Sequence, residues 1–175
     1  EVGIGAWEYA DYAPDFTGGV GWKSASAGRL DLTGRPWAET AYTQVAFDLV
    51  PIRMGVVRPD KAFEKHSPSA WRMSNALESW SWDGCEGKKT VAEVYATGYK
   101  VRLILNGKTV GEKKVPANAC VRFKVAYEPG ELTAISLAKD GKELGRTSLV
   151  SAGKETKLTL VPERSEIVRG DLCYI

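Results

Sequence analysis

The sequence predicts a mainly β protein, in which an antiparallel β-sandwich over residues 76–161 follows a single β/α unit over residues 1–50. Three observations lead to this fold class. Residues 76–161 contain about seven short strand-like runs, with turn signals every ~8–12 residues. Asn106–Gly107 separates two of these runs and favours a type I′ hairpin turn. The run "ACVRFKVAY" alternates apolar and charged residues, which is typical of a strand with one buried face.

The first 50 residues are expected to form a strand, a long loop and a helix. "VGIGAWEYA" is typical of a short buried strand, and the Gly, Pro, Asp and Ser content of residues 11–34 is typical of a loop. Trp37, Ala41 and Val45 then recur at helical spacing, and Pro51 ends the run. One β/α unit cannot bury its own apolar side, so this unit needs a partner.

Residues 51–75 are interpreted as a linker that lies over a surface. They contain five of the 24 lysines and arginines and three prolines, and they show little periodicity. Residues 162–175 are expected to begin a further β domain, because "DLCYI" has the composition of a strand.

The sandwich strands follow one another through short turns. "TVAEVYAT" and "KVRLILN" are the first two strand-like runs, and the Asn106–Gly107 turn joins the second to "KTVGEKKV". "EPGE" marks a turn after "ACVRFKVAY", and a second hairpin is centred on Asp140–Gly141. "KLTLV" supplies the last predicted strand.

The charge pattern argues against nucleic-acid and membrane partners. The formal net charge is +2, and charged residues of both signs are interspersed over 26% of the chain, so there is no basic patch or polybasic anchor. No apolar run approaches the ~18 residues that a membrane span needs.

The cysteines and the histidine predict neither a metal site nor a cofactor. Cys85, Cys120 and Cys173 are far apart, no C-x-x-C pair occurs, and His66 stands alone, so the four ligands of a usual zinc site are missing. A disulfide framework is not indicated, although one bridge is left open. The three thiols are expected to be free and buried, and His66 to be exposed in a polar segment.

Trp80 and Trp82 pose a choice between binding and packing. On a strand, these two side chains share one face. If exposed, they would form a carbohydrate-binding strip. If buried, they would pack against the sandwich core or against the β/α unit, and residues 83–87 would form the turn into the next strand.

Six segments in order resemble the middle to late part of glycoside hydrolase family 2, the β-galactosidase group. The similarity covers essentially the whole chain. It is carried by "GAWEYADY" (5–12), "VGWKSASAGRLDLTGRPWAETAYTQVAF" (20–47), "SWSWDGCEG" (79–87), "YATGYKVRLILNGKTVG" (95–111), "YEPGELTA" (127–134) and "DLCYI" (171–175).

The resemblance implies a specific domain order. Residues 1–50 would be the last strand, loop and helix of a (β/α)8 barrel, and residues 51–75 the linker. Residues 76–161 would be an immunoglobulin-like β-sandwich, and residues 162–175 the start of the following β domain. The resemblance also favours burial of Trp80 and Trp82 at the junction between the barrel and the sandwich. The parent enzyme would hydrolyse terminal β-linked sugars, such as galactosides, with retention of configuration through a covalent glycosyl-enzyme.

The resemblance also assigns roles to residues of the first unit. Trp7 would form the floor of the sugar subsite, and Trp22 would line the rim of the pocket. Glu8 would accept a hydrogen bond from a sugar hydroxyl, because active sites of such barrels gather at the C-terminal ends of the strands. The structural alternatives are a barrel-core tryptophan, a loop-capping carboxylate and a loop-anchoring tryptophan. Both catalytic carboxylates lie on earlier barrel strands in the family, so no catalytic residue is expected in this chain. Departures from the family pattern at Glu8–Tyr9–Ala10 and Ala27 leave the identity of the sugar open.

The expected partners are the carbohydrate substrate of the parent enzyme and either the remaining barrel or a second copy of the chain. The sequence itself leaves the compartment open. The resemblance points to a secreted or periplasmic parent enzyme, because bacterial members of the family are often exported. Two rival hypotheses assign the chain to functional classes other than enzymes. The sandwich could be a carbohydrate-binding module that uses Trp80 and Trp82, or a structural spacer and interaction domain.

Overall fold

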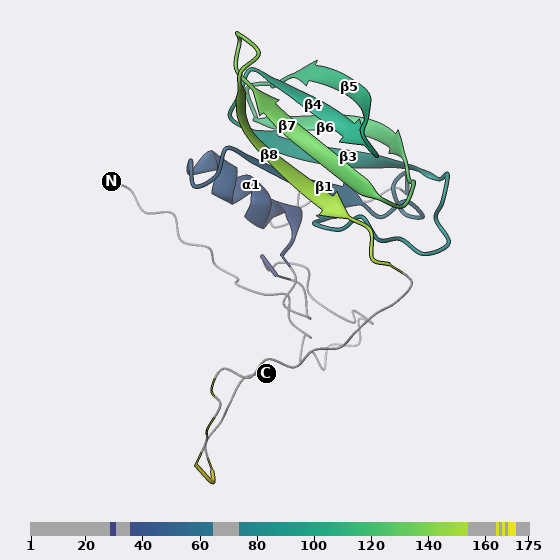
Figure 1. Ribbon diagram of the computed structural model, residues 1–175, viewed down its shortest axis with the longest axis vertical. Coiled ribbons are helices and arrows are strands. Elements are labelled where there is room, and N and C mark those ends of the chain that lie inside the picture. Colours follow the sequence, from purple (N-terminus) through teal and green to yellow (C-terminus); the bar gives the residue numbers. More distant parts are fainter. Residues whose placement is uncertain are drawn as a thin grey trace, which may run out of the picture.

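The computed structural model describes residues 29–30, 36–64, 74–153, 164, 166 and 168–170. Two four-stranded antiparallel sheets pack on each other, and one helix of the described chain lies against them (Figure 1). The elements in order are α1 (Ala38–Ala46), β1 (Ile52–Val57), β2 (Ala76–Leu77), β3 (Lys89–Ala96), β4 (Lys100–Leu105), β5 (Lys108–Lys114), β6 (Cys120–Ala126), β7 (Glu131–Leu137) and β8 (Glu143–Val150). The prediction of a β-sandwich is confirmed.

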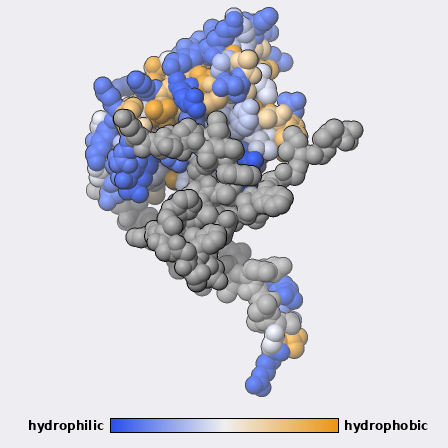
Figure 2. All heavy atoms as spheres, turned by 180° about the vertical axis from the view of Figure 1, so that it is seen from behind, coloured by the Kyte–Doolittle hydropathy of each residue, from blue (hydrophilic) through white to orange (hydrophobic). Residues whose placement is uncertain are grey.

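The two sheets have the strand orders β2-β1-β3-β6 and β5-β4-β7-β8. Apolar residues from both inner faces form one continuous core between them, to which Val94, Leu103, Phe123 and Leu132 contribute. Burial of these side chains is the main source of stability in such a sandwich. The outer surface is more hydrophilic than this core. On the face seen in Figure 2, hydrophilic residues surround smaller hydrophobic areas.

Two local sequence signals are confirmed in detail. Asn106 and Gly107 both have positive φ values, 49° and 77°, as the type I′ turn between β4 and β5 requires. In β6 the residues Val121, Phe123 and Val125 are buried and alternate with exposed residues. The second hairpin, β7 to β8, also turns at Asp140–Gly141, where Gly141 has a φ of 86°.

The linker interpretation of residues 51–75 is wrong for its first part. Residues 52–57 form β1, a central strand between β2 and β3, so the sandwich begins at Ile52 rather than at residue 76. This strand is buried on both faces, because the core lies on one side and α1 on the other. Its sequence "IRMGVV" therefore lacks the alternation that marks a strand with one exposed face.

The expected helix is confirmed but is shorter than its apolar pattern. It ends at Ala46, well before Pro51, because Asp48 adopts a left-handed conformation with a φ of 55°. The amide of Leu49 then donates to the carbonyl of Gln44 at 2.9 Å, which closes the last turn. The strand expected at residues 2–10, the strand expected at 157–161 and nearly all of residues 162–175 lie outside the described residues.

Gly98, between β3 and β4, permits a close backbone approach that a side chain would prevent. A Cβ atom at this position would lie 2.3 Å from Ser136 Oγ and 2.9 Å from the carbonyl oxygen of Leu137. The carbonyl belongs to β7 and accepts a hydrogen bond from the amide of Tyr99, so it cannot move freely.

We therefore expect Gly98→Ala to lower the free energy of unfolding by about 1–3 kcal/mol, the usual cost of overpacking. Urea denaturation followed by tryptophan fluorescence measures this change. Gly153→Ala is the matched control, because nothing lies within 4 Å of its added Cβ. Equal stability of the two variants would show that the approach at Gly98 is not tight.

Candidate functional site

The candidate site is the junction between helix α1 and the outer face of the sheet that contains β1 and β3. Ala38, Ala41 and Val45 form the buried stripe of the helix and pack with Ala76 and Tyr95 of the sheet. These positions recur at three- and four-residue spacing, which places them on one side of the helix. The small side chains let the helix lie close to the strands (Figure 1).

Gly55 of β1 is part of this close packing. A Cβ atom there would lie 3.2 Å from the Cβ of Ala76 and 3.6 Å from the Cβ of Ala38. The absence of a side chain thus brings α1, β1 and β2 together at one point.

Glu93 of β3 is a buried carboxylate at the edge of this contact. It is 5% exposed and receives three hydrogen bonds. Ser74 Oγ donates to its Oε2 at 2.6 Å, Tyr95 Oη donates to the same oxygen at 2.8 Å, and Arg122 Nε donates to Oε1 at 2.9 Å. A buried charge is tolerated when it is paired and hydrogen-bonded in this way.

Ser74 connects Glu93 to the helix. Its backbone amide donates to Oε1 of Glu39, in the first turn of α1, at 3.0 Å, while its hydroxyl reaches Glu93. The same hydroxyl accepts a hydrogen bond from the amide of Ala76 at 3.0 Å. A continuous polar chain therefore runs from Glu39 through Ser74 to Glu93, and it links helix, β2 and β3 beside the apolar contact.

Further polar contacts position the helix along its length. Arg53 Nε of β1 donates to Oε1 of Gln44 at 2.8 Å. The rings of Tyr42 and Tyr95 meet edge to face, with centroids 5.6 Å apart. These contacts fix the rotation and the register of α1 on the sheet.

The environment of Tyr95 changes its titration. Burial, followed by the adjacent Glu93 charge and the hydrogen bond to it, raises the pKa of Tyr95 far above its ordinary value. Burial and the same carboxylate also raise the pKa of the Cys120 thiol, so this cysteine stays protonated and unreactive at neutral pH.

This shift predicts that the stability supplied by Tyr95 is lost at alkaline pH. The folded-state pKa lies above the unfolded value of about 10, so the contribution is complete below about pH 10 and falls as the pH rises further. The difference in unfolding free energy between the unchanged protein and Tyr95→Phe should therefore shrink between pH 8 and pH 11. Urea denaturation of both proteins at each pH measures it. A constant difference over this range would contradict the prediction.

Trp80 and Trp82 do not form an exposed carbohydrate-binding strip. Trp80 is 1% exposed, and its Nε1 donates to the carbonyl of Glu128 at 2.9 Å. Its ring meets Tyr127 edge to face, with centroids 4.9 Å apart. Trp82 is half-buried against the same core. Residues 79–82 are not in a strand, and both tryptophans pack with the core between the two sheets rather than with the α1 contact. Their expected burial is therefore confirmed, but its place is the sandwich core and not the junction, and the binding-module hypothesis loses its stacking pair.

Of the other residues singled out in the sequence, two lie in the described part of the chain and the others lie outside it. Cys85 and Cys120 are free thiols, buried and half-buried respectively. Cys173, His66 and the three predicted substrate-binding residues, which are Trp7, Glu8 and Trp22, lie outside the described residues. Within the described ranges no group of three His, Cys, Asp or Glu side chains could hold a metal ion, and no helix is long and apolar enough to cross a membrane.

Sequence reasoning missed the polar chain of Glu39, Ser74 and Glu93. One signal was present, since Glu93 interrupts the apolar run "TVAEVYA" at a position where its neighbours are buried. Its partners could not be inferred, because Ser74 lies 19 residues away and Glu39 a further 35.

Comparison with protein families gives a match for the sandwich. Residues 87–145 match a family described as a domain of unknown function, DUF4982. This range begins just before β3 and ends within β8.

Individual proteins with a similar sequence or structure are glycosidases, and the structures match a larger part of this chain than the family model does. The chain is 32% identical over 84 residues to the beta-galactosidase BoGH2A of Bacteroides ovatus, a match over 46% of this chain and 10% of the relative. It is 31% identical to a glycosyl hydrolase family 2 member from Bacteroides cellulosilyticus, with a TM-score of 0.71 over 85% of this chain and 20% of that structure. A beta-glycosidase from Bacteroides vulgatus shares the fold, with a TM-score of 0.62 at 20% identity over 94% of this chain and 18% of that structure.

The chain thus spans about a fifth or less of the length of these relatives. The family model, the curated relative and the structures agree with the motifs quoted from the sequence. Together they support a glycoside hydrolase family 2-like fragment, within which residues 87–145 match DUF4982.

Proposed function

We propose that this chain is the part of a retaining family 2 glycosidase that fixes the last β/α unit of the catalytic barrel to the following β-sandwich. The observation that carries the proposal is the packing of α1 on the sandwich through Ala38, Ala41 and Val45, reinforced by the buried chain from Glu39 to Glu93. A helix held by both apolar and polar contacts keeps a fixed orientation. The wall of the sugar pocket that precedes this helix in the chain would then be fixed with it.

In this proposal residues 1–50 are the last strand, loop and helix of a (β/α)8 barrel, and residues 162–175 begin a further β domain. The sandwich itself plays a structural role. The names of the relatives, a beta-galactosidase and a beta-glycosidase, support hydrolysis of a terminal β-linked sugar by the parent enzyme.

The end of α1 offers a surface for the rest of that enzyme. Phe47 is 54% exposed and Leu49 is 72% exposed, and both follow directly on the helix that packs on the sandwich. Large apolar side chains in such positions are often covered by a partner. We propose the remaining barrel as this partner. Dimerisation of the 175-residue chain through these residues, detected by light scattering and lost in Phe47→Ser with Leu49→Ser, would instead favour a second copy.

The proposed sugar contacts lie in the first 25 residues. Trp7 would stack its flat face on the C–H-rich side of a pyranose, Glu8 would accept a hydrogen bond from a sugar hydroxyl, and Trp22 would line the rim. Retaining glycosidases need two carboxyl groups about 5–5.5 Å apart, and we propose that both belong to barrel strands outside this chain.

Activity assays test the proposal directly. The 175-residue chain alone should not hydrolyse 4-nitrophenyl β-galactoside, whereas the full product of its gene should hydrolyse one of a panel of nitrophenyl β-glycosides. In that product Trp7→Ala should lower kcat/KM at least about tenfold, the scale of one lost substrate contact. Turnover by the short chain that survives repurification, or a full product inactive on the whole panel, would contradict the proposal.

A further inference from the structure

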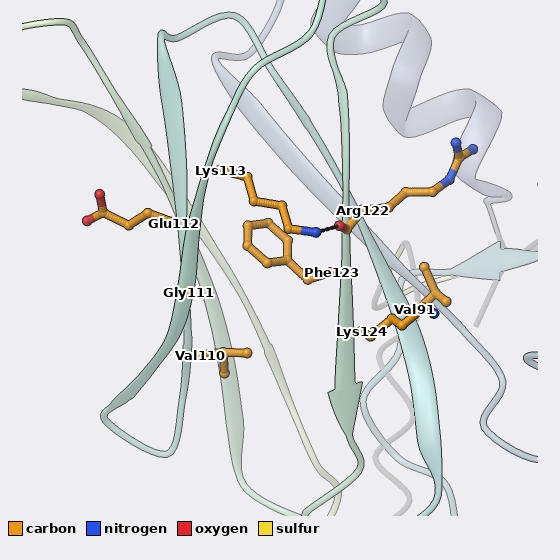
Figure 3. A pocket seen from close by; sticks show the side chains of 8 residues that line it. All are labelled: Val91, Val110, Gly111, Glu112, Lys113, Arg122, Phe123 and Lys124. Atoms are coloured by element: carbon orange, nitrogen blue, oxygen red, sulfur yellow. Dashed lines mark hydrogen bonds between the residues drawn. The ribbon is translucent and has the colours of Figure 1, made fainter.

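The two sides of the sandwich differ in how they are closed. Strands β1 and β8 contact each other on one side, where a Cβ atom on Gly145 would lie 2.5 Å from Pro51. On the other side β5 and β6, the edge strands of opposite sheets, flank a groove of ≈ 380 Å³ (Figure 3). The groove is lined by β5, by β6 and by Val91 of β3.

The backbone of β6 has one free edge along this groove. In the antiparallel ladder successive residues direct their N–H and C=O groups to opposite sides. The carbonyl of Ala119 accepts a hydrogen bond from the amide of Ala96, and the amide of Tyr127 donates to the carbonyl of Lys88. The backbone groups of the odd-numbered residues of β6 therefore point to β3. Arg122, Lys124 and Ala126 then direct their backbone groups to the groove, and the described chain contains no strand that pairs with them.

Lys113 of β5 shows that this edge accepts a hydrogen bond. Its Nζ crosses the groove and donates to the carbonyl oxygen of Arg122 at 2.6 Å (Figure 3). A flexible side chain therefore occupies one of the acceptor positions that an added strand would use.

The groove carries positive charge. Lys113 and Lys124 line it, and neither is paired with a carboxylate of the described residues. Glu112 points away from Lys113 and is bonded to Arg102 at 2.6 Å and to Lys100 at 3.3 Å, so its charge is already offset (Figure 3). A ligand in the groove would thus meet uncompensated ammonium groups.

The apolar lining suits a peptide better than a sugar. Phe123, the aromatic residue of the lining, is buried beneath Lys113, whose Nζ lies 5.1 Å from the ring centroid, so its face is not available for stacking. Val110 is bulged out of the register between β4 and β5 and is exposed at the groove. Alternating apolar and acidic side chains of an extended peptide could contact Val110 and the two lysines in turn.

We propose that the open edge of β6 binds an extended acidic segment of another polypeptide as an added strand. Backbone hydrogen bonds to Lys124 and Ala126 supply the pairing, and Lys113 and Lys124 select for acidic side chains. A second copy of β6 is disfavoured on this edge, because its own lysines and arginine would face like charges. This interaction is independent of glycosidase activity.

The test uses the ¹⁵N-labelled 175-residue chain and a capped heptapeptide in which glutamate alternates with valine. Binding should shift the amide resonances of β6 and slow the hydrogen exchange of Lys124 and Ala126. Two peptides N-methylated on alternate residues distinguish strand pairing from charge attraction. The form methylated on the edge that faces β6 should lose binding, and the other form should keep it.

Charge variants complete the test. Lys124→Glu should weaken peptide binding by about tenfold, since it replaces an attraction by a repulsion across the strand pair. Lys142→Glu, at another exposed lysine, in the turn between β7 and β8, should leave binding unchanged.

Four results would overturn the proposal. These are unchanged β6 amides at saturating peptide, equal binding of both N-methylated forms, equal weakening by the two lysine variants, and protection of the β6 edge without peptide. In the last case, dependence on protein concentration would indicate a second copy, and independence would indicate another segment of the same chain.

Discussion

Trp80→Ala is expected to lower the free energy of unfolding of the sandwich by about 3–5 kcal/mol, the range for removal of a large buried aromatic side chain. Trp80 lies inside the core, contacts the ring of Tyr127 and donates a hydrogen bond to the carbonyl of Glu128. Its own carbonyl accepts a hydrogen bond from the hydroxyl of Ser151. The substitution therefore opens a cavity where the segment before β3 meets the segment after β8.

Trp82→Phe is the matched comparison. Its indole Nε1 is buried and finds no acceptor among the described residues. Replacement by phenylalanine removes this unsatisfied donor and keeps an aromatic ring, so the change should stay within about 1 kcal/mol. Guanidinium denaturation followed by far-UV circular dichroism gives both values. If Trp82→Phe costs as much as Trp80→Ala, the two tryptophans do not play the different roles assigned to them.

Glu93→Ala is expected to lower the unfolding free energy by about 2–4 kcal/mol, because two buried hydroxyl donors lose their acceptor at a cost of about 1–3 kcal/mol each. The substitution leaves the hydroxyls of Ser74 and Tyr95 without their shared acceptor and removes the partner of Arg122. Because Ser74 also holds Glu39, the first turn of α1 should loosen more than the sheets do.

Two measurements separate these effects. Urea denaturation gives the global change, and amide resonances of residues 38–46 report on the helix. Glu143→Ala is the control, since Glu143 pairs with Arg146 on the exposed face of β8 and its loss should not shift the denaturation midpoint measurably. Similar midpoints for Glu93→Ala and Glu143→Ala would show that the buried network does not stabilise the fold.

The sequence predicted the parts of the fold that depend on near neighbours. The alternation of β6 and the Asn106–Gly107 turn depend on adjacent residues, and both are confirmed. Strand β1 escaped prediction because α1 covers its outer face, and this contact is set by residues distant in the chain. The same holds for Glu93, whose role depends on Ser74 and Glu39 rather than on its own strand.

The burial of Trp80 shows the limit of reading side-chain roles from a motif. "SWSWDG" is compatible with an exposed strip and with a packed core, and the deciding contacts come from Tyr127 and Glu128. The family resemblance favoured burial, whereas the alternation alone favoured neither. The proposed sugar contacts of Trp7, Glu8 and Trp22 remain predictions.

Native-state hydrogen exchange of the 175-residue chain tests most directly whether α1 and the sandwich form one unit. If the junction fixes the helix, the amides of Tyr42, Val45 and Ala46 should open with free energies close to those of β3. Exchange of these helix amides at rates near those of an unfolded peptide, while β3 stays protected, would contradict the account.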